Sequence, residues 1–87
     1  LGIPGRVVER HDDEALPMGV VDFGGVRRDT CFAYTPDVSI DEYVIVHVGF
    51  AIGIVDEVEA ERTFALLSEQ DLSEELGSRA RTAGGLP

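Results

Sequence analysis

Residues 43–52 read Tyr-Val-Ile-Val-His-Val-Gly-Phe-Ala-Ile, and this stretch decides the fold class. β-branched and aromatic residues dominate it, and such residues favour extended structure. The alternate residues on one face are all apolar: Val44, Val46, Val48 and Phe50. Because successive side chains of a strand point to opposite faces, we expect one strand over Tyr43–Ile52, with this apolar face turned to the interior.

The residues before this strand predict a hairpin. Two β-rich runs, Met18–Phe23 and Val26–Tyr34, are separated by Gly24 and Gly25. A tight hairpin turn needs positive φ at one or both central residues, and glycine adopts this conformation without steric cost. A further short extended segment around Val7 precedes the hairpin.

A helix is expected after the last strand. Near residue 56 the β-branched residues give way to Ala, Leu and Glu, which favour helix. Asp56 followed by Glu59 is a capping-box pattern that marks the start of a helix. A helix that runs to about Leu67 would bury residues at three- and four-residue spacings. These residues are Ala60, Thr63, Phe64 and Leu67.

The expected fold is mainly β: a small OB-like β-barrel followed by a C-terminal α-helix. Closure of the barrel removes the exposed strand edges that so small a sheet would otherwise leave. The 87 residues suffice for a single domain, which we assign to residues 1–67. Asp71 with Glu74 predicts a second short helix that Gly77 closes. Residues 68–87 are therefore interpreted as a short helix and a flexible acidic and polar tail.

The charge balance excludes several kinds of partner. The chain has 17 acidic residues against 7 basic ones, and its formal net charge is −10. Nucleic-acid binding needs cations that displace phosphate counterions, so we expect no nucleic acid as a partner. An anionic membrane surface is disfavoured for the same reason, and a basic protein surface is the better match.

Cysteine usage and hydropathy indicate a cellular compartment. Cys31 is the only cysteine and cannot form an internal disulfide. No apolar run approaches the roughly 18 residues that a membrane-spanning helix needs, and no basic and apolar leader opens the chain. We therefore expect a reduced, soluble protein of the cytoplasm that does not associate with a membrane.

Few residues suggest enzyme chemistry. The chain contains no Walker loop, no G-x-G-x-x-G, no C-x-x-C and no H-E-x-x-H. Cys31 lies in an expected strand, and a lone strand cysteine is more often a small packing residue than a reactive one. The acidic residues at 12–14 are interpreted as a solvated loop tip.

Two other features each allow two interpretations. His47 lies opposite the apolar strand face, with Tyr43 and Ile45 beside it. It is either a histidine satisfied under the C-terminal helix, which spacing alone favours, or an imidazole at a partner or metal site. In the second case Gly49 lets another backbone approach closely. Leu1–Gly5 are either the lead-in to the first strand or a mobile arm that reaches a partner.

Four segments, taken in order, resemble a known family. They are Leu-Gly-Ile-Pro-Gly-Arg-Val-Val at 1–8, Val-Asp-Phe-Gly-Gly-Val-Arg-Arg at 21–28, Pro-Asp-Val at 36–38 and Tyr-Val-Ile-Val-His-Val-Gly-Phe-Ala-Ile at 43–52. The ordered set resembles the HypC/HybG/HupF family of [NiFe]-hydrogenase assembly chaperones. The acidic helix expected after it fits as well, so the resemblance covers residues 1 to about 67.

The resemblance implies an OB-like barrel with a following helix and a role that is not enzymatic. Proteins of this family bind the scaffold protein HypD and help to hold iron as Fe(CN)2CO, with no organic cofactor. They deliver this iron unit to the [NiFe]-hydrogenase large-subunit precursor. A cysteine directly after the initiator Met, just before the Leu-Gly-Ile-Pro-Gly motif, holds the iron. The family histidine in the Val-His-x-Gly-Phe motif corresponds to His47.

The sequence departs from the family pattern at two places. The chain is given from Leu1, so the Met-Cys pair is not among its residues, and Cys31 does not stand in for it. Asp41 replaces the usual glycine before the acidic residue of the fourth strand, which alters a turn. The resemblance makes His47 a candidate metal ligand. The candidate partner-binding residues are Leu1, Gly2, Ile3, Pro4, Gly5, His47, Gly49 and Phe50.

Two other functions compete with the carrier interpretation. An OB-type module for an oligonucleotide or oligosaccharide is compatible with the barrel. The negative charge and the scarcity of aromatic residues (two Tyr, four Phe and no Trp) argue against it, because such modules stack bases on aromatic rings. A small hydrolase would need Cys31 and His47 to meet, and no third residue that orients them is identifiable.

Overall fold

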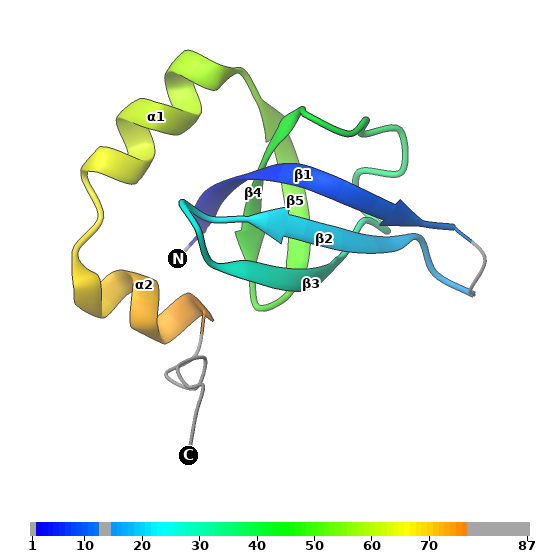
Figure 1. Cartoon of the computed structure of the whole chain (residues 1–87), viewed down its shortest axis with the longest axis horizontal. Helices are drawn as coiled ribbons and strands as arrows, with labels where there is room; N and C mark the ends of the chain where they lie inside the picture. The colour runs from blue at the N-terminus through cyan, green and yellow to red at the C-terminus, as the bar shows by residue number, and fades with distance from the viewer. Residues whose placement is uncertain (1, 13–14, 77–87) are drawn as a thin grey trace.

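The computed structural model describes residues 2–12 and 15–76, which form a closed barrel of five strands followed by two helices (Figure 1). The strands are β1 (Ile3–His11), β2 (Met18–Asp22), β3 (Arg27–Cys31), β4 (Tyr43–His47) and β5 (Phe50–Val55). The helices are α1 (Glu57–Ala65) and α2 (Glu69–Leu76), both on one side of the barrel. Strand neighbours follow the order β1-β2-β3-β5-β4, and among these strands the β3–β5 pairing is the parallel one. The expected mainly β, OB-like fold is confirmed.

Strand β1 closes the barrel because it pairs with two neighbours. Its first half pairs with β4 and its second half with β2, and Arg6 is opposite a residue of each. The register with β2 shifts between Val7 and Glu9. Such a bulge bends a strand and increases its twist, which lets one strand serve both halves of a small barrel.

The barrel interior is filled by small aliphatic side chains and two phenylalanines. The buried cluster consists of Ile3, Val7, Val21, Phe23, Phe32, Val38, Val44, Val46 and Ala51. Gly19 of β2 leaves room for this packing, since a Cβ built there would lie 2.5 Å from Cε2 of Phe32 and would clash with the carbonyl oxygen of Glu9. Glycine at position 19 therefore lets the Glu9 backbone and the Phe32 ring both lie close to the backbone of β2.

The hairpin predicted over Gly24 and Gly25 is confirmed. Both glycines have positive φ, +71° and +105°, and the Gly25 N–H donates to a carboxylate oxygen of Asp22 at 2.7 Å. The flanking strands are shorter than predicted, because β2 ends at Asp22 and β3 begins only at Arg27.

The single strand predicted over residues 43–52 is wrong. β4 ends at His47, the chain reverses at Val48 and Gly49 with φ of +52° and +81°, and β5 begins at Phe50. Two consecutive residues with positive φ form a tight hairpin turn, and the turn resets the alternation of faces. Val48 and Phe50 are consequently 69% and 39% exposed, not interior, while Ala51 is fully buried.

Helix α1 begins as predicted. The Asp56 carboxylate accepts the Glu59 N–H at 2.8 Å, which is half of the expected capping box. The helix ends at Ala65, two residues earlier than predicted. Ala60 is buried, and Phe64 and Leu67 are partly buried against the barrel core, whereas Thr63 is half-buried.

Helix α2 begins earlier than predicted. Ser68 and Asp71 cap it reciprocally: each backbone N–H donates to the other side chain at 3.1 Å. Ser68, and not Asp71, is therefore the capping residue. Leu72 and Leu76 pack against the core. Gly77 and the tail after it lie outside the described residues. No helix in the described ranges has the length and apolarity to cross a bilayer.

Candidate functional site

The start of β1 lies beside the end of β4. Ile3 is opposite Val46, the residue before His47, and Gly2 precedes it beside Ile45 and Val46. A Cβ built on Gly2 would clash with Cγ2 of Ile45, which shares the outer face of β4 with His47. The start of β1 and the end of β4 at His47 are therefore neighbours in the barrel.

Residues 3–5 do not form a mobile arm. They belong to β1, and all three are buried. Gly5 needs its lack of a side chain, because a Cβ there would lie 2.5 Å from Cγ1 of Val21 and 2.8 Å from Phe23. The mobile-arm alternative is wrong for these residues, and a flexible arm cannot include Gly5. Leu1 lies outside the described residues, and the assignment of residues 1–5 to partner binding stays a prediction.

His47 is half-exposed and is contacted by the second helix. Its Nδ1 lies 3.1 Å from Oε2 of Glu75, whose side chain is only 9% exposed. The backbone N–H of Val48 donates to the other carboxylate oxygen, Oε1, at 3.2 Å. Burial by itself would raise the pKa of Glu75, but hydrogen bonds, among them those from Val48 and His47, bring it below the ordinary value for a glutamate.

Sequence reasoning missed Glu75. It lies 28 residues after His47, in an acidic helix whose glutamates look alike in the sequence. Only the packing of α2 on the barrel distinguishes it from Glu74. The first interpretation of His47, a histidine satisfied under the C-terminal helix expected to run to about Leu67, is wrong in two respects: its partner Glu75 lies in α2, and the side chain is 46% exposed.

An exposed apolar patch adjoins His47. We call it the hairpin patch: Tyr34, Val48, Phe50 and Ile52, which line a shallow hollow together with His47. The Tyr34 and Phe50 rings contact each other with centroids 5.8 Å apart and planes inclined by 54°. Tyr34 and Ile52 are 69% and 53% exposed, so the patch presents aromatic and aliphatic surface to solvent. Of its members, only Phe50 was among the predicted partner-binding residues.

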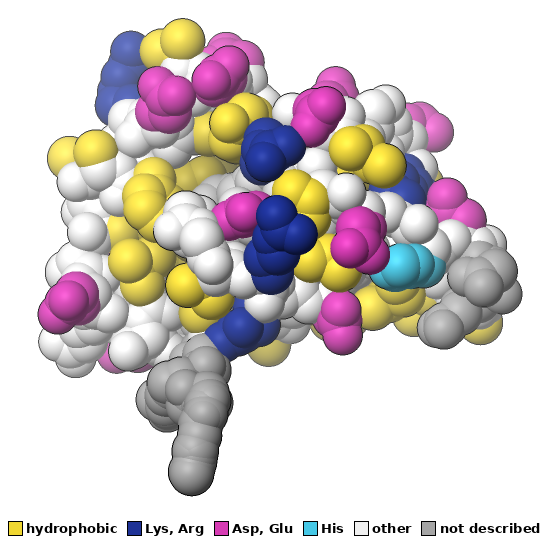
Figure 2. Space-filling model, in the orientation of Figure 1, with side chains coloured by type: hydrophobic (Ala, Val, Ile, Leu, Met, Phe, Trp, Pro, Cys, Tyr) yellow, Lys and Arg dark blue, Asp and Glu magenta, His cyan; other side chains and the backbone are white. Residues whose placement is uncertain are grey.

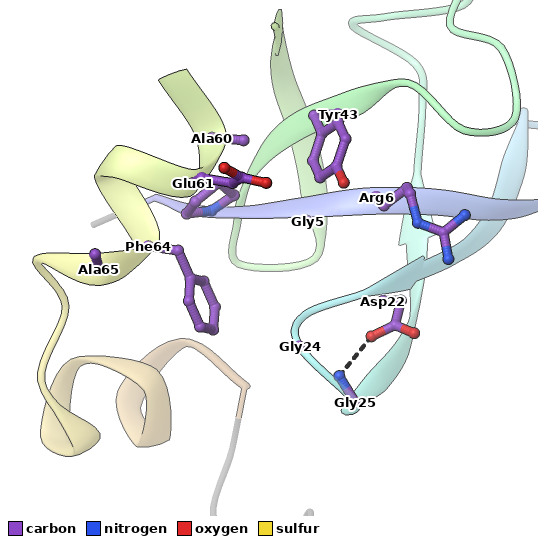
Figure 3. Close-up of a pocket in the computed structure, with 11 residues that line it drawn as sticks. Gly5, Arg6, Asp22, Gly24, Gly25, Tyr43, Ala60, Glu61, Phe64 and Ala65 are labelled. Atoms are coloured by element: carbon purple, nitrogen blue, oxygen red, sulfur yellow. Dashed lines mark hydrogen bonds between the residues drawn. The ribbon is translucent and has the colours of Figure 1, made fainter. Parts of the chain in front are cut away.

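A second hollow of about 440 Å³ lies between α1 and the barrel (Figure 3). Phe64 projects from α1 into it, toward the turn at Gly24. Two charged residues along its edge pair with other protein groups: Arg6 with Asp41 at 2.7 Å, and Asp22 with the Gly25 N–H. These contacts describe the docking of a helix on a barrel, and we assign no ligand to this hollow.

Cys31 is a packing residue, as predicted. Its side chain is buried, and its N–H donates to the Gly49 carbonyl at 2.9 Å. β5 lies between β3 and β4, so Cys31 and His47 are two strands apart, about 10 Å between backbones. The buried thiol and the outward imidazole therefore do not form the pair that a hydrolase would need.

The described residues do not form a complete metal site. Within residues 2–12 and 15–76, no group of three or more His, Cys, Asp or Glu side chains is placed to hold a metal ion. His47 with Glu75 supplies at most two donors. A metal bound by His47 would therefore take further ligands from beyond this part of the chain or from a partner.

Fold and surface together define a small closed β-barrel with an exposed apolar patch beside a half-exposed histidine. Residues 1–67 match the model of the HupF/HypC family, and the chain belongs to this family. It is 48% identical over 71 residues to the hydrogenase maturation factor HypC of Synechocystis, covering 79% of this chain and 93% of that protein. It is 49% identical over 69 residues to HypC of Cupriavidus necator (79% and 73% covered). Over 75 residues it is 35% identical to the hydrogenase maturation factor HybG of Escherichia coli K12 (82% and 90% covered).

Proposed function

We propose that this protein is a hydrogenase maturation chaperone of the cytoplasm and not an enzyme. It binds HypD, helps to carry the Fe(CN)2CO unit and delivers this unit to the [NiFe]-hydrogenase large-subunit precursor. Membership of the HupF/HypC family supports the general role, since the similar proteins are hydrogenase maturation factors. The iron unit is cargo in this proposal.

One observation supports the iron-carrying role most directly: the start of β1 is paired beside His47. In the family pattern the iron-holding cysteine directly precedes the Leu-Gly-Ile-Pro-Gly motif, so a residue at that position would emerge next to this imidazole. A thiolate is a soft ligand that suits low-valent iron, and an imidazole is a suitable second donor. We infer that His47 contributes to the iron site.

The hairpin patch is the surface that we assign to HypD. Aromatic residues are enriched at the cores of protein interfaces, and Tyr34 and Phe50 supply two adjacent rings. Acidic side chains are distributed over the visible face of the molecule (Figure 2), and the net charge of −10 favours a partner with a basic surface. We therefore expect the matching site on HypD to be apolar and to be surrounded by basic residues.

The test is a binding measurement with HypD under reducing, anaerobic conditions, using the full-length protein. Ile52→Asp puts a charge into the hairpin patch and should weaken HypD binding at least about tenfold. Leu66→Asp is the matched control, because Leu66 is 82% exposed at the end of α1, away from the β4–β5 turn. Equal weakening by both variants would contradict the assigned surface. Failure of the wild-type protein to bind either HypD or the large-subunit precursor would contradict the function.

The iron part of the proposal has its own measurement. The purified complex with HypD should contain iron, and infrared spectroscopy should detect bound cyanide and carbon monoxide. A complex that forms in good yield without iron would refute the carrier role and leave a partner-binding role.

A further inference from the structure

Glu75 of α2 contacts the β4–β5 turn through both of its carboxylate oxygens. One carboxylate oxygen lies 3.1 Å from Nδ1 of His47, and the other accepts the Val48 N–H at 3.2 Å. The same side chain therefore binds the ring and the main chain directly after it. A carboxylate that is hydrogen-bonded at both oxygens cannot rotate without breaking a hydrogen bond. Its own orientation is therefore fixed, and it orients the imidazole of His47.

The helix that supplies Glu75 is itself anchored. Leu72 and Leu76 pack against the barrel core on the same helix. Nε of Arg28, in β3, donates to the carbonyl oxygen of Leu76 at 3.1 Å, next to Glu75. A basic side chain at the last carbonyl groups of a helix stabilises that end. Glu75 is thus held from its own helix and from the barrel.

The chemistry of the pair determines the tautomer of His47. An ionised carboxylate only accepts hydrogen bonds, so the nitrogen that contacts it, Nδ1, must bear the proton. In the neutral ring the lone pair is then on Nε2, the nitrogen that would bind a metal. Carboxylates commonly fix metal-binding histidines in this way, with the ring N–H donating to the acid.

We propose that Glu75 is a positioning residue, which holds His47 as the Nδ1–H tautomer and fixes the direction of Nε2 for the iron cargo. This inference rests on the proposed function for its iron part, whereas the tautomer is a property of the protein alone. Glu75 lies in α2, beyond the residues 1–67 that match the family model. The second helix, which the sequence suggested was only a short element before a tail, therefore contributes to the site.

The sharpest variant is Glu75→Gln, which retains the shape of the side chain. Its amide oxygen can still accept the Val48 N–H, but its amide nitrogen would donate to Nδ1 and move the ring proton to Nε2. The tautomer of His47 is read by ¹⁵N NMR of the labelled protein without a partner. We expect Nδ1–H in the wild type and Nε2–H in Glu75→Gln, with little change in melting temperature.

The second readout is the iron content of the purified HypD complex. Loss of an outer-shell partner of a metal ligand typically costs about 10–100-fold in metal affinity, so Glu75→Gln should retain clearly less iron after dilution or chelator challenge. Glu74→Gln is the matched control. It removes the same charge from the neighbouring, exposed position and should leave tautomer and iron content as in the wild type.

The outcomes separate the two hypotheses. An Nε2–H wild-type ring, or a tautomer that Glu75→Gln does not change, overturns the positioning role whatever the iron content. If the wild-type complex holds iron and Glu75→Gln holds it equally well, only the role of Glu75 is wrong. If the wild-type HypD complex holds no iron, the carrier role in the proposed function is wrong.

Discussion

Gly24, in the turn between β2 and β3, lies directly under the ring of Phe64 on α1: a Cβ built on this glycine would be 3.2 Å from Cζ of the ring. The turn and the helix are therefore fitted to each other where α1 packs against the barrel (Figure 3). The same glycine has φ of +71°, so two independent reasons favour glycine at this position.

Gly24→Ala should therefore destabilise the protein by about 1–2 kcal/mol through backbone strain alone, and by more if the ring cannot move. Gly25→Ala is the control, because Gly25 also has positive φ but a Cβ there would meet nothing within 4 Å. Urea unfolding measures both. In a Phe64→Ala background the cost of Gly24→Ala should fall and that of Gly25→Ala should not. Equal costs in both backgrounds would show that the contact with Phe64 has no energetic effect.

Val48 is a β-branched residue at φ of +52°, a conformation in which such side chains are strained. Val48→Asn should stabilise the protein by up to about 1 kcal/mol, since Asn-Gly is the preferred pair for this kind of hairpin turn. Thermal unfolding measures the change. A loss of stability would mean that the exposed valine makes apolar contacts that outweigh its strain. HypD binding should weaken in the same variant, because Val48 belongs to the hairpin patch.

Cys31→Ala should cost about 1–2 kcal/mol of stability through lost burial, with HypD binding intact. Denaturant unfolding and a pull-down with HypD measure the two quantities. Loss of iron transfer in a well-folded Cys31→Ala protein would overturn the packing role that the structure supports.

His47→Ala should leave the melting temperature close to that of the wild type, because the side chain is 46% exposed and its removal opens no core cavity. Under the proposed function the same variant should reduce the iron content of the purified HypD complex. A large drop in melting temperature with unchanged iron per folded molecule would instead make His47 a structural residue that anchors α2.

Local signals in the sequence determined several parts of this protein by themselves. The Gly24-Gly25 turn and the Asp56 cap were predicted correctly because each depends on residues within four positions of one another. Glycine adopts positive φ without steric cost, and an aspartate side chain can accept an unpaired backbone N–H at the start of a helix. Both effects are local and do not depend on the rest of the fold. The ordered family segments likewise identify the class of protein from the sequence alone.

Tertiary structure alone decided the turn at Val48 and the partner of His47. Valine disfavours positive φ, so the local sequence did not predict a turn at Val48. The pairing of β4 with β5 and the hydrogen bond from the Val48 N–H to Glu75 hold this turn in place. Glu75 is 28 residues from His47 in the sequence and contacts it only because Leu72 and Leu76 pack against the barrel and so position α2. Burial of apolar surface is favourable in any orientation, so the sequence shows only that the apolar side chains of α2 must pack somewhere. The shape of the closed barrel determines which glutamate of α2 contacts His47.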